Sequence, residues 1–99
     1  MKYLKLKPKE PLERDITRNI RGYLNIRGIF HYKQWQGLGS LPGVSDIIGI
    51  YRGKYLAIEV KCPGNKLSDR QKAFLDRVNE EGGIGFMATS VDDVIEKLR

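Results

Sequence analysis

Apolar residues recur at helical spacing between residues 12 and 27. They follow the i, i+3 and i, i+4 intervals that place side chains on one face of a helix. These positions are Leu12, Ile16, Ile20, Tyr23 and Leu24. Pro11 suits the first turn of this helix, and Gly28 is a natural stop. Gly22 lies inside the predicted helix and weakens it slightly.

Three apolar runs follow, and each predicts a β-strand. Residues 29–35, 44–51 and 55–61 are the predicted strands, because they are rich in aromatic and β-branched residues. A loop with three glycines and a proline, residues 36–43, separates the first two. The tight turn Arg52-Gly53-Lys54 joins the next two, so we expect them to form a hairpin.

The last third of the chain predicts a helix, a strand and a second helix. Ser68 followed by Gln71 is a capping box. The apolar face of that helix continues through Phe74, Leu75 and Val78, and Gly82-Gly83 ends it. Residues 84–88 form the fourth strand, and Ser90 caps a last helix. That helix should turn four side chains inward: Val91, Val94, Ile95 and Leu98.

The resulting order is α-β-β-β-α-β-α, which is an α/β fold with a mixed sheet and a C-terminal helix. The third and fourth strands are joined by a helix, so they should be parallel with a right-handed crossover. A chain of 99 residues is long enough for one domain, since domains typically hold about 100–150 residues. We therefore expect residues 1–99 to form a single domain.

The net charge of +6 favours nucleic acid or another anionic surface as a partner, because phosphates bound by cations release counterions. A basic surface without any such role is the alternative. Four lysines lie near the N-terminus and form either a phosphate-contacting arm or a basic tail. They are Lys2, Lys5, Lys7 and Lys9.

Composition excludes several classes of protein and site. No apolar run approaches the roughly 18 residues that a membrane span needs, so no membrane partner is expected. The N-terminus lacks the apolar region of a signal peptide, which favours a cytoplasmic location. Cys62 is the only cysteine, which excludes an internal disulfide and a multi-cysteine zinc site. His31 is the only histidine, which excludes a two-histidine metal site.

The predicted hairpin brings together the residues that suggest chemistry. Asp46 begins one strand and Glu59 ends the other, so both should lie at the same end of the sheet. Lys61 should project from the same face as Glu59, two residues away. Two close carboxylates repel, and one tends to take up a proton unless a divalent cation lies between them. A surface hairpin with an ion pair between Glu59 and Lys61 is the alternative.

Mg²⁺ suits such a pair, because it prefers oxygen ligands and needs only one or two carboxylates. The carbonyl of Val60 is a candidate third ligand. Mn²⁺ can replace Mg²⁺, since it also suits carboxylate and water ligands. A bound metal lowers the pKa of water and neutralises a phosphate oxygen, while the Lys61 ammonium stabilises the charge of the transition state.

With these residues the chain resembles the PD-(D/E)XK nuclease superfamily, and more closely its VRR-NUC (virus-type replication-repair nuclease) branch. The resemblance covers about residues 12–98. It rests on Glu13, on Gly43-Val44-Ser45-Asp46, on Ile58-Glu59-Val60-Lys61 and on Leu67-Ser68-Asp69-Arg70-Gln71. It implies a restriction-endonuclease-like αβββαβ core. One departure is Ser45, where this branch commonly has proline.

The resemblance also implies roles for single residues. Asp46 and Glu59 would bind the metal, and Lys61 would be catalytic. Glu13 would help to position a metal or water, although a carboxylate in a first helical turn also favours the helix dipole. Gln71 would line the site, although its place in the capping box is reason enough for it. Candidate DNA contacts are Lys66, Trp35 and Ser45; Trp35 either stacks on a base or packs against the domain.

The expected function is metal-dependent hydrolysis of phosphodiester bonds in DNA. Stand-alone members of the family act as homodimers on branched DNA, so the resemblance implies a Holliday-junction resolvase-like endonuclease. Apolar residues that either supply the dimer interface or cap the monomer's own core are Ile29, Phe30, Leu38 and Leu41. The alternatives are a nuclease acting on flapped or ordinary duplex through the same site, and a non-catalytic basic nucleic-acid-binding module.

Overall fold

Seven helices and strands follow one another in residues 12–99, the part of the chain that this computed structural model describes. They are α1 (Glu13–Ile26), β1 (His31–Lys33), β2 (Ile47–Tyr51), β3 (Lys54–Val60), α2 (Asp69–Glu80), β4 (Ile84–Ala88) and α3 (Val91–Lys97). The order α-β-β-β-α-β-α is the predicted one. Pro11 and the N-terminal lysine run lie outside the described residues.

The four strands form one mixed sheet in the order β1-β2-β3-β4. β2 and β3 are the predicted hairpin, with Ile47 opposite Ile58 and Tyr51 opposite Lys54. Its turn places both Arg52 (φ 51°) and Gly53 (φ 80°) in the left-handed region, as a two-residue hairpin turn of this kind requires. β3 and β4 are parallel, which confirms the crossover through α2.

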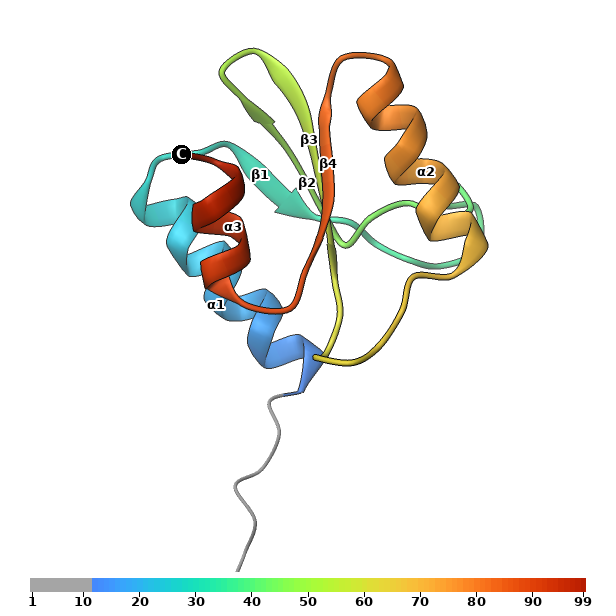
Figure 1. The fold of residues 1–99 in the computed structure, drawn as a ribbon, viewed down its shortest axis with the longest axis horizontal. Helices are drawn as coiled ribbons and strands as arrows, with labels where there is room; N and C mark the ends of the chain where they lie inside the picture. Colours follow the sequence, from blue (N-terminus) through green and yellow to red (C-terminus); the bar gives the residue numbers. More distant parts are fainter. Residues whose placement is uncertain (1–11) are drawn as a thin grey trace, which may run out of the picture.

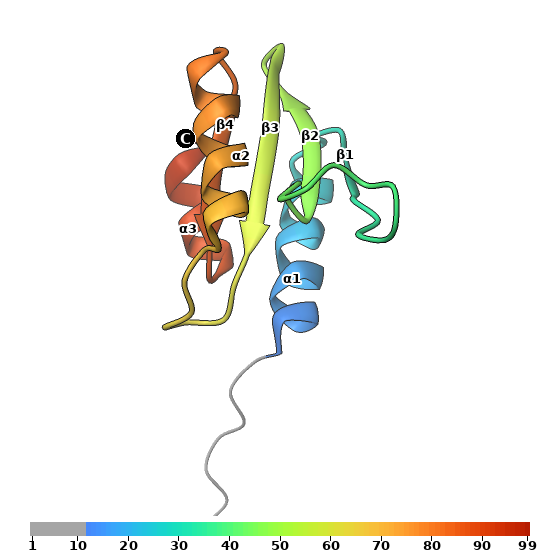
Figure 2. The same cartoon turned by 90° about the vertical axis from the view of Figure 1, so that its right-hand side faces the viewer.

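Helices cover both faces of the sheet. α1 and α3 lie on one face and α2 on the other (Figures 1 and 2). On the first face, α1 and α3 bury side chains such as Ile20, Leu24 and Leu98 against Leu56 and Ile58 of β3. A second, smaller cluster packs α2 against the opposite face; it consists of Val44, Ile48, Ala57, Leu75 and Val78. Alternate residues of β3 therefore face different helices.

The strand boundaries differ from the prediction at the ends. β1 is much shorter than residues 29–35, because the backbone N–H of Ile29 still bonds to the carbonyl of Leu24 and ends α1 (2.9 Å). β2 begins later than residue 44, because the N–H of Val44 closes a turn onto the carbonyl of Leu41 (3.1 Å). The inward position predicted for Ile95 is wrong, since Ile95 is 37% exposed. Val94 is the buried residue of this helix, and Leu98, directly after it, is buried too.

Helix α2 begins at the predicted capping box. The hydroxyl of Ser68 accepts a hydrogen bond from the N–H of Gln71 (3.1 Å), and the side chain of Gln71 accepts one from the N–H of Ser68 (2.9 Å). This reciprocal pair fixes where α2 starts and how Gln71 is oriented. Within residues 12–99, no helix is long and apolar enough to cross a membrane.

Candidate active site

The hairpin brings Asp46 and Glu59 together at the end of the sheet remote from its turn. Asp46 comes directly before β2, and the pairing of Ile47 with Ile58 places it beside the last residues of β3. Its Oδ2 accepts a hydrogen bond from the backbone N–H of Val60 (2.8 Å). This bond holds the Asp46 carboxylate against β3, so its position depends on the backbone of both strands.

Glu59 is an almost fully buried carboxyl group, with 2% of the residue exposed. Its Oε2 accepts a hydrogen bond from Nε2 of Gln71 (3.2 Å). Its Oε1 is buried and has no hydrogen-bond partner among the described residues. An unpaired buried acceptor is costly, so this oxygen is available to a ligand that the chain itself does not supply.

Several neighbours set the charge of Glu59. Burial, the negative charge of Asp46 and a hydrogen bond between the two carboxyl groups raise the pKa of Glu59 from 4.5 to about 8. The ammonium of Lys61 acts in the opposite direction and lowers this pKa, while Glu13 raises it further. Lys61 and Glu13 are therefore both close enough to act on Glu59, as expected for residues of one site.

Gln71 makes two kinds of contact through one side chain. It completes the capping box of α2, and the same side chain donates to Glu59. One amide thus ties the start of the helix to the buried carboxyl group. Glu13 lies in the first turn of α1, and its carbonyl accepts a hydrogen bond from the hydroxyl of Thr17 (2.9 Å).

Gln36, which is not among the residues predicted from the sequence, also contacts the site. Its Nε2 donates to Oδ1 of Asp46 (3.3 Å) and to the carbonyl of Val44 (2.9 Å). The loop that carries Gln36 therefore folds back onto Asp46, the residue with which the loop ends. No pattern in the sequence marks this contact, because it depends on the path of a glycine-rich loop.

Gly43 brings that loop close to α2. It has a positive φ of 76°, and a Cβ placed on it would lie 2.3 Å from the carbonyl oxygen of Arg70. Only glycine fits this backbone conformation and this close approach. Gly43 thus fixes the path of the chain into Asp46 beside the helix that carries Gln71.

The three predicted DNA contacts lie in different environments. Lys66 is exposed in the loop before α2. Trp35 is 68% exposed, so it does not pack in the core and its ring is accessible. Ser45 is fully buried at 0% exposure, and its hydroxyl has no partner among the described residues. The Ser45 side chain therefore lies inside the protein and not on a surface that DNA can reach.

The donor atoms at this site suit Mg²⁺. Asp46 and Glu59 supply two carboxylates, a divalent cation would remove their repulsion, and the unpaired Oε1 of Glu59 offers a ready ligand atom. Among residues 12–99, no group of three or more His, Cys, Asp or Glu side chains is arranged to hold a metal ion. A metal here would depend on the two carboxylates and on backbone and water oxygens, while the charge of Glu13 also acts on Glu59.

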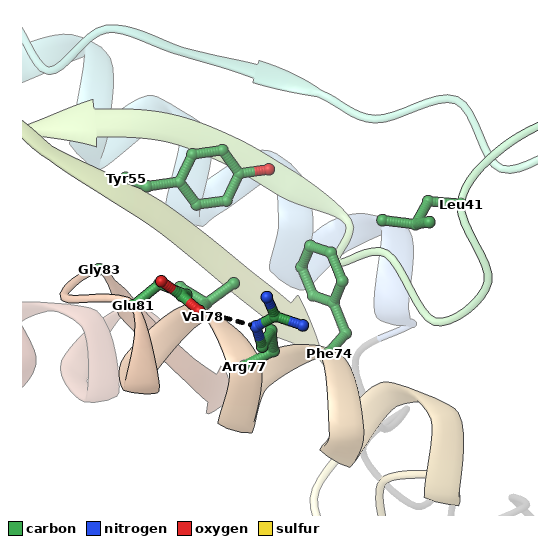
Figure 3. Close-up of a pocket in the computed structure, with 7 residues that line it drawn as sticks. All are labelled: Leu41, Tyr55, Phe74, Arg77, Val78, Glu81 and Gly83. Atoms are coloured by element: carbon green, nitrogen blue, oxygen red, sulfur yellow. Dashed lines mark hydrogen bonds and ion pairs between the residues drawn. The ribbon is translucent and has the colours of Figure 1, made fainter.

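A separate hollow of about 340 Å³ lies beside α2 and is mostly apolar. Figure 3 shows Leu41, Tyr55 and Phe74 around it, with Arg77 paired to Glu81 at its side (3.0 Å). None of the carboxylates at the end of β3 lines this hollow. The candidate active site is therefore separate from this hollow, at the opposite end of β3 from Tyr55.

Comparison with known proteins agrees with this architecture. The model of the VRR-NUC domain matches residues 8–92. A solved structure of a VRR_NUC domain protein superposes with a TM-score of 0.72 at 22% sequence identity, covering 89% of this chain and 85% of that chain. This likeness concerns the fold. No curated protein sequence matches the chain. Because the domain model spans most of its length, the chain belongs to the VRR-NUC family, which is a nuclease-type family.

Proposed function

We propose that this protein is a divalent-metal-dependent endonuclease that hydrolyses phosphodiester bonds in DNA. The observation that carries the proposal is the buried carboxyl group of Glu59 next to the half-buried Asp46 and Lys61, in a chain of the VRR-NUC family. A buried carboxyl group with an unpaired oxygen lowers stability. A positively charged ligand would offset this cost.

Each residue of the site would have a different role. Asp46, Glu59 and the carbonyl of Val60 would hold Mg²⁺ or Mn²⁺. Such an ion, when bound, neutralises a phosphate oxygen and lowers the pKa of an attacking water. Lys61 places a positive charge where negative charge develops on the phosphate, and this stabilises the transition state. The N–H of Val60 and the amide of Gln71 hold the two carboxylates in position.

Branched DNA is the substrate class we propose, with the protein acting as a homodimer. Phe30, Leu38 and Leu41 are 65%, 97% and 61% exposed, so they do not cap the monomer's own core, whereas Ile29 is buried within it. A second copy of the chain would cover such exposed apolar side chains. A two-fold dimer would present two equivalent sites to the two equivalent strands of a four-way junction.

The test uses a labelled four-way junction and a matched linear duplex, each with Mg²⁺, with Mn²⁺ or with chelator. We expect paired symmetric nicks on the junction that chelator abolishes. Glu59→Gln and Asp46→Asn should abolish cleavage, whereas the matched surface variant Glu80→Gln should cut like the wild type. Equal cutting of both substrates would keep the nuclease and reject the preference for junctions. Binding without cleavage in either metal would favour a non-catalytic binding module.

The dimer is tested separately by sedimentation at micromolar concentration, with and without the junction. A monomer under both conditions would reject the homodimer. Replacing Leu38, the most exposed of the three residues, with serine should weaken a dimer without loss of folding stability.

A further inference from the structure

A basic groove of about 420 Å³ lies between α1 and β1, outside the carboxylate site. Four cationic side chains line it: Arg14, Arg18, Arg21 and Lys33. Of the described side chains that line the groove, none is acidic. Arg18 pairs with the neighbouring Asp15 (3.1 Å). Within residues 12–99 the other three cations of the groove form no ion pair, so the groove is strongly positive.

Gly22 forms part of the wall of this groove, and it lies in the middle of α1. A Cβ placed on Gly22 would meet nothing within 4 Å, so packing within the described chain does not require glycine there. Glycine inside a helix costs about 1 kcal/mol relative to alanine. The open backbone surface at Gly22 is explained by a ligand that approaches the helix closely, with cations on either side.

Each wall of the groove has a residue close in the chain or in space to a residue that acts on the carboxylate site. Arg14 follows Glu13, whose charge acts on Glu59. At the other wall, Lys33 also lines a second hollow, together with Trp35 and Gln36. Gln36 donates to Asp46. A chain of phosphates lying in the groove would thus pass the exposed ring of Trp35 and reach the pair Asp46 and Glu59.

We propose that the groove between α1 and β1 binds the sugar-phosphate backbone of the DNA strand next to the scissile bond, with the strand lying over Gly22. This inference rests on the proposed function for the identity of the nucleic acid. Phosphate is the ligand chemistry that fits four cations and no carboxylate, since each phosphate neutralised by Lys or Arg releases condensed counterions. Such contacts position a strand without reading its sequence.

The test measures binding of a labelled duplex and of the four-way junction in chelator, over a series of salt concentrations. The groove variant is Arg18→Ala with Lys33→Ala, one cation from each wall. Both side chains are exposed, so folding is not at risk. The matched control is Arg77→Ala with Lys54→Ala. It also removes an ion-paired helical arginine, which Figure 3 shows beside Glu81, and an exposed strand lysine. Neither residue lines the groove.

We expect the groove variant to bind roughly tenfold more weakly at about 0.1 M salt, with the slope of log affinity against log salt smaller by about two. The control should keep the wild-type slope. Equal effects of both variants would mean that only net charge matters, and would overturn the proposal. An unchanged groove variant, or a wild type that does not bind DNA, would also overturn it.

Gly22→Ala gives a second test, in which stability and binding should move in opposite directions. The variant should melt at a higher temperature, because alanine favours the helix, and should bind DNA several-fold more weakly. Unchanged binding would contradict the close approach of the strand. The two proposals fail differently: binding through the groove without cleavage in Mg²⁺ or Mn²⁺ rejects the nuclease, whereas wild-type cleavage by the groove variant with unchanged affinity rejects the groove.

Discussion

Replacing Glu59 with glutamine should make the protein more stable at alkaline pH in the absence of metal. Glutamine has nearly the shape of a protonated glutamate. Its amide oxygen can still accept the hydrogen bond from Gln71, and its amide nitrogen can donate to Asp46. The substitution therefore removes the negative charge and keeps the packing around this side chain, which is 2% exposed.

The direction and size of the effect follow from the pKa of Glu59. Because the folded state raises this pKa from 4.5 to about 8, the folded protein holds a proton that the unfolded chain has released. Stability from this group is fully present below pH 4.5 and is lost as the pH rises through about 8. The loss is at most about 5 kcal/mol, since a tenfold change in proton binding is about 1.4 kcal/mol.

The assay is urea unfolding of the wild type and of Glu59→Gln between about pH 5 and pH 9, in chelator. The two proteins should have similar free energies of unfolding at the acidic end. At the alkaline end the variant should be more stable by about 2–5 kcal/mol. Groups that do not interact with Glu59 titrate alike in both proteins and cancel in the difference. Glu80→Gln, on the exposed surface of α2, controls for the loss of one charge.

A difference between wild type and Glu59→Gln that stays constant with pH would refute the reasoning. It would show that the Glu59 carboxyl is ionised throughout, or that its charge is already balanced by Lys61. If the free energy of unfolding of Glu59→Gln, relative to the wild type, decreased toward alkaline pH, the expected direction of the effect would be refuted. A parallel change in Glu80→Gln would show that net charge, and not the buried position, is responsible.

Further substitutions test the other parts of the site. Mg²⁺ should raise the melting temperature of the wild type at about pH 8 but not that of Asp46→Asn, and equal shifts by calorimetry would remove Asp46 from the metal site. Lys61→Ala should abolish cleavage while leaving this Mg²⁺-dependent shift, so loss of both would mean that Lys61 is needed to build the site. Gln71→Ala should lower stability by about 0.5–1.5 kcal/mol through loss of the hydrogen bond that its side chain accepts from the N–H of Ser68 and should also slow cleavage; normal cleavage would limit Gln71 to capping. Gly43→Ala should cost more than about 1 kcal/mol in urea unfolding, and clearly more than Gly39→Ala, which shares a positive φ but has open space around it.

The sequence predicts the helices, the strands and the hairpin of this protein, because each of them depends on residues that are close together in the chain. The hairpin follows from a two-residue turn between apolar runs, and the start of α2 from Ser68 and Gln71. Once the hairpin is given, Asp46 must lie near Glu59, since antiparallel pairing fixes which ends meet. The structure has that pairing, with Asp46 bonded to Val60.

The features that the sequence does not predict depend on contacts made by the loop between β1 and β2. The contact of Gln36 with Asp46, the burial of Ser45 and the exposure of Trp35 all follow from the path of this loop. That path is fixed by Gly43 against the backbone of α2, a contact between segments that are distant in sequence. Periodicity and turn residues carry no information about such a contact.

The short edge strand β1 has a consequence for how the protein behaves at high concentration. β1 has three residues, and among the described strands it pairs only with β2, so one of its edges is open to pairing with another chain. Short length and nearby cations are two ways in which proteins protect such an edge. Lys33 and the arginines of α1 would repel a second copy that approached this edge. Variants that remove these cations should therefore be more prone to aggregation in concentrated solution.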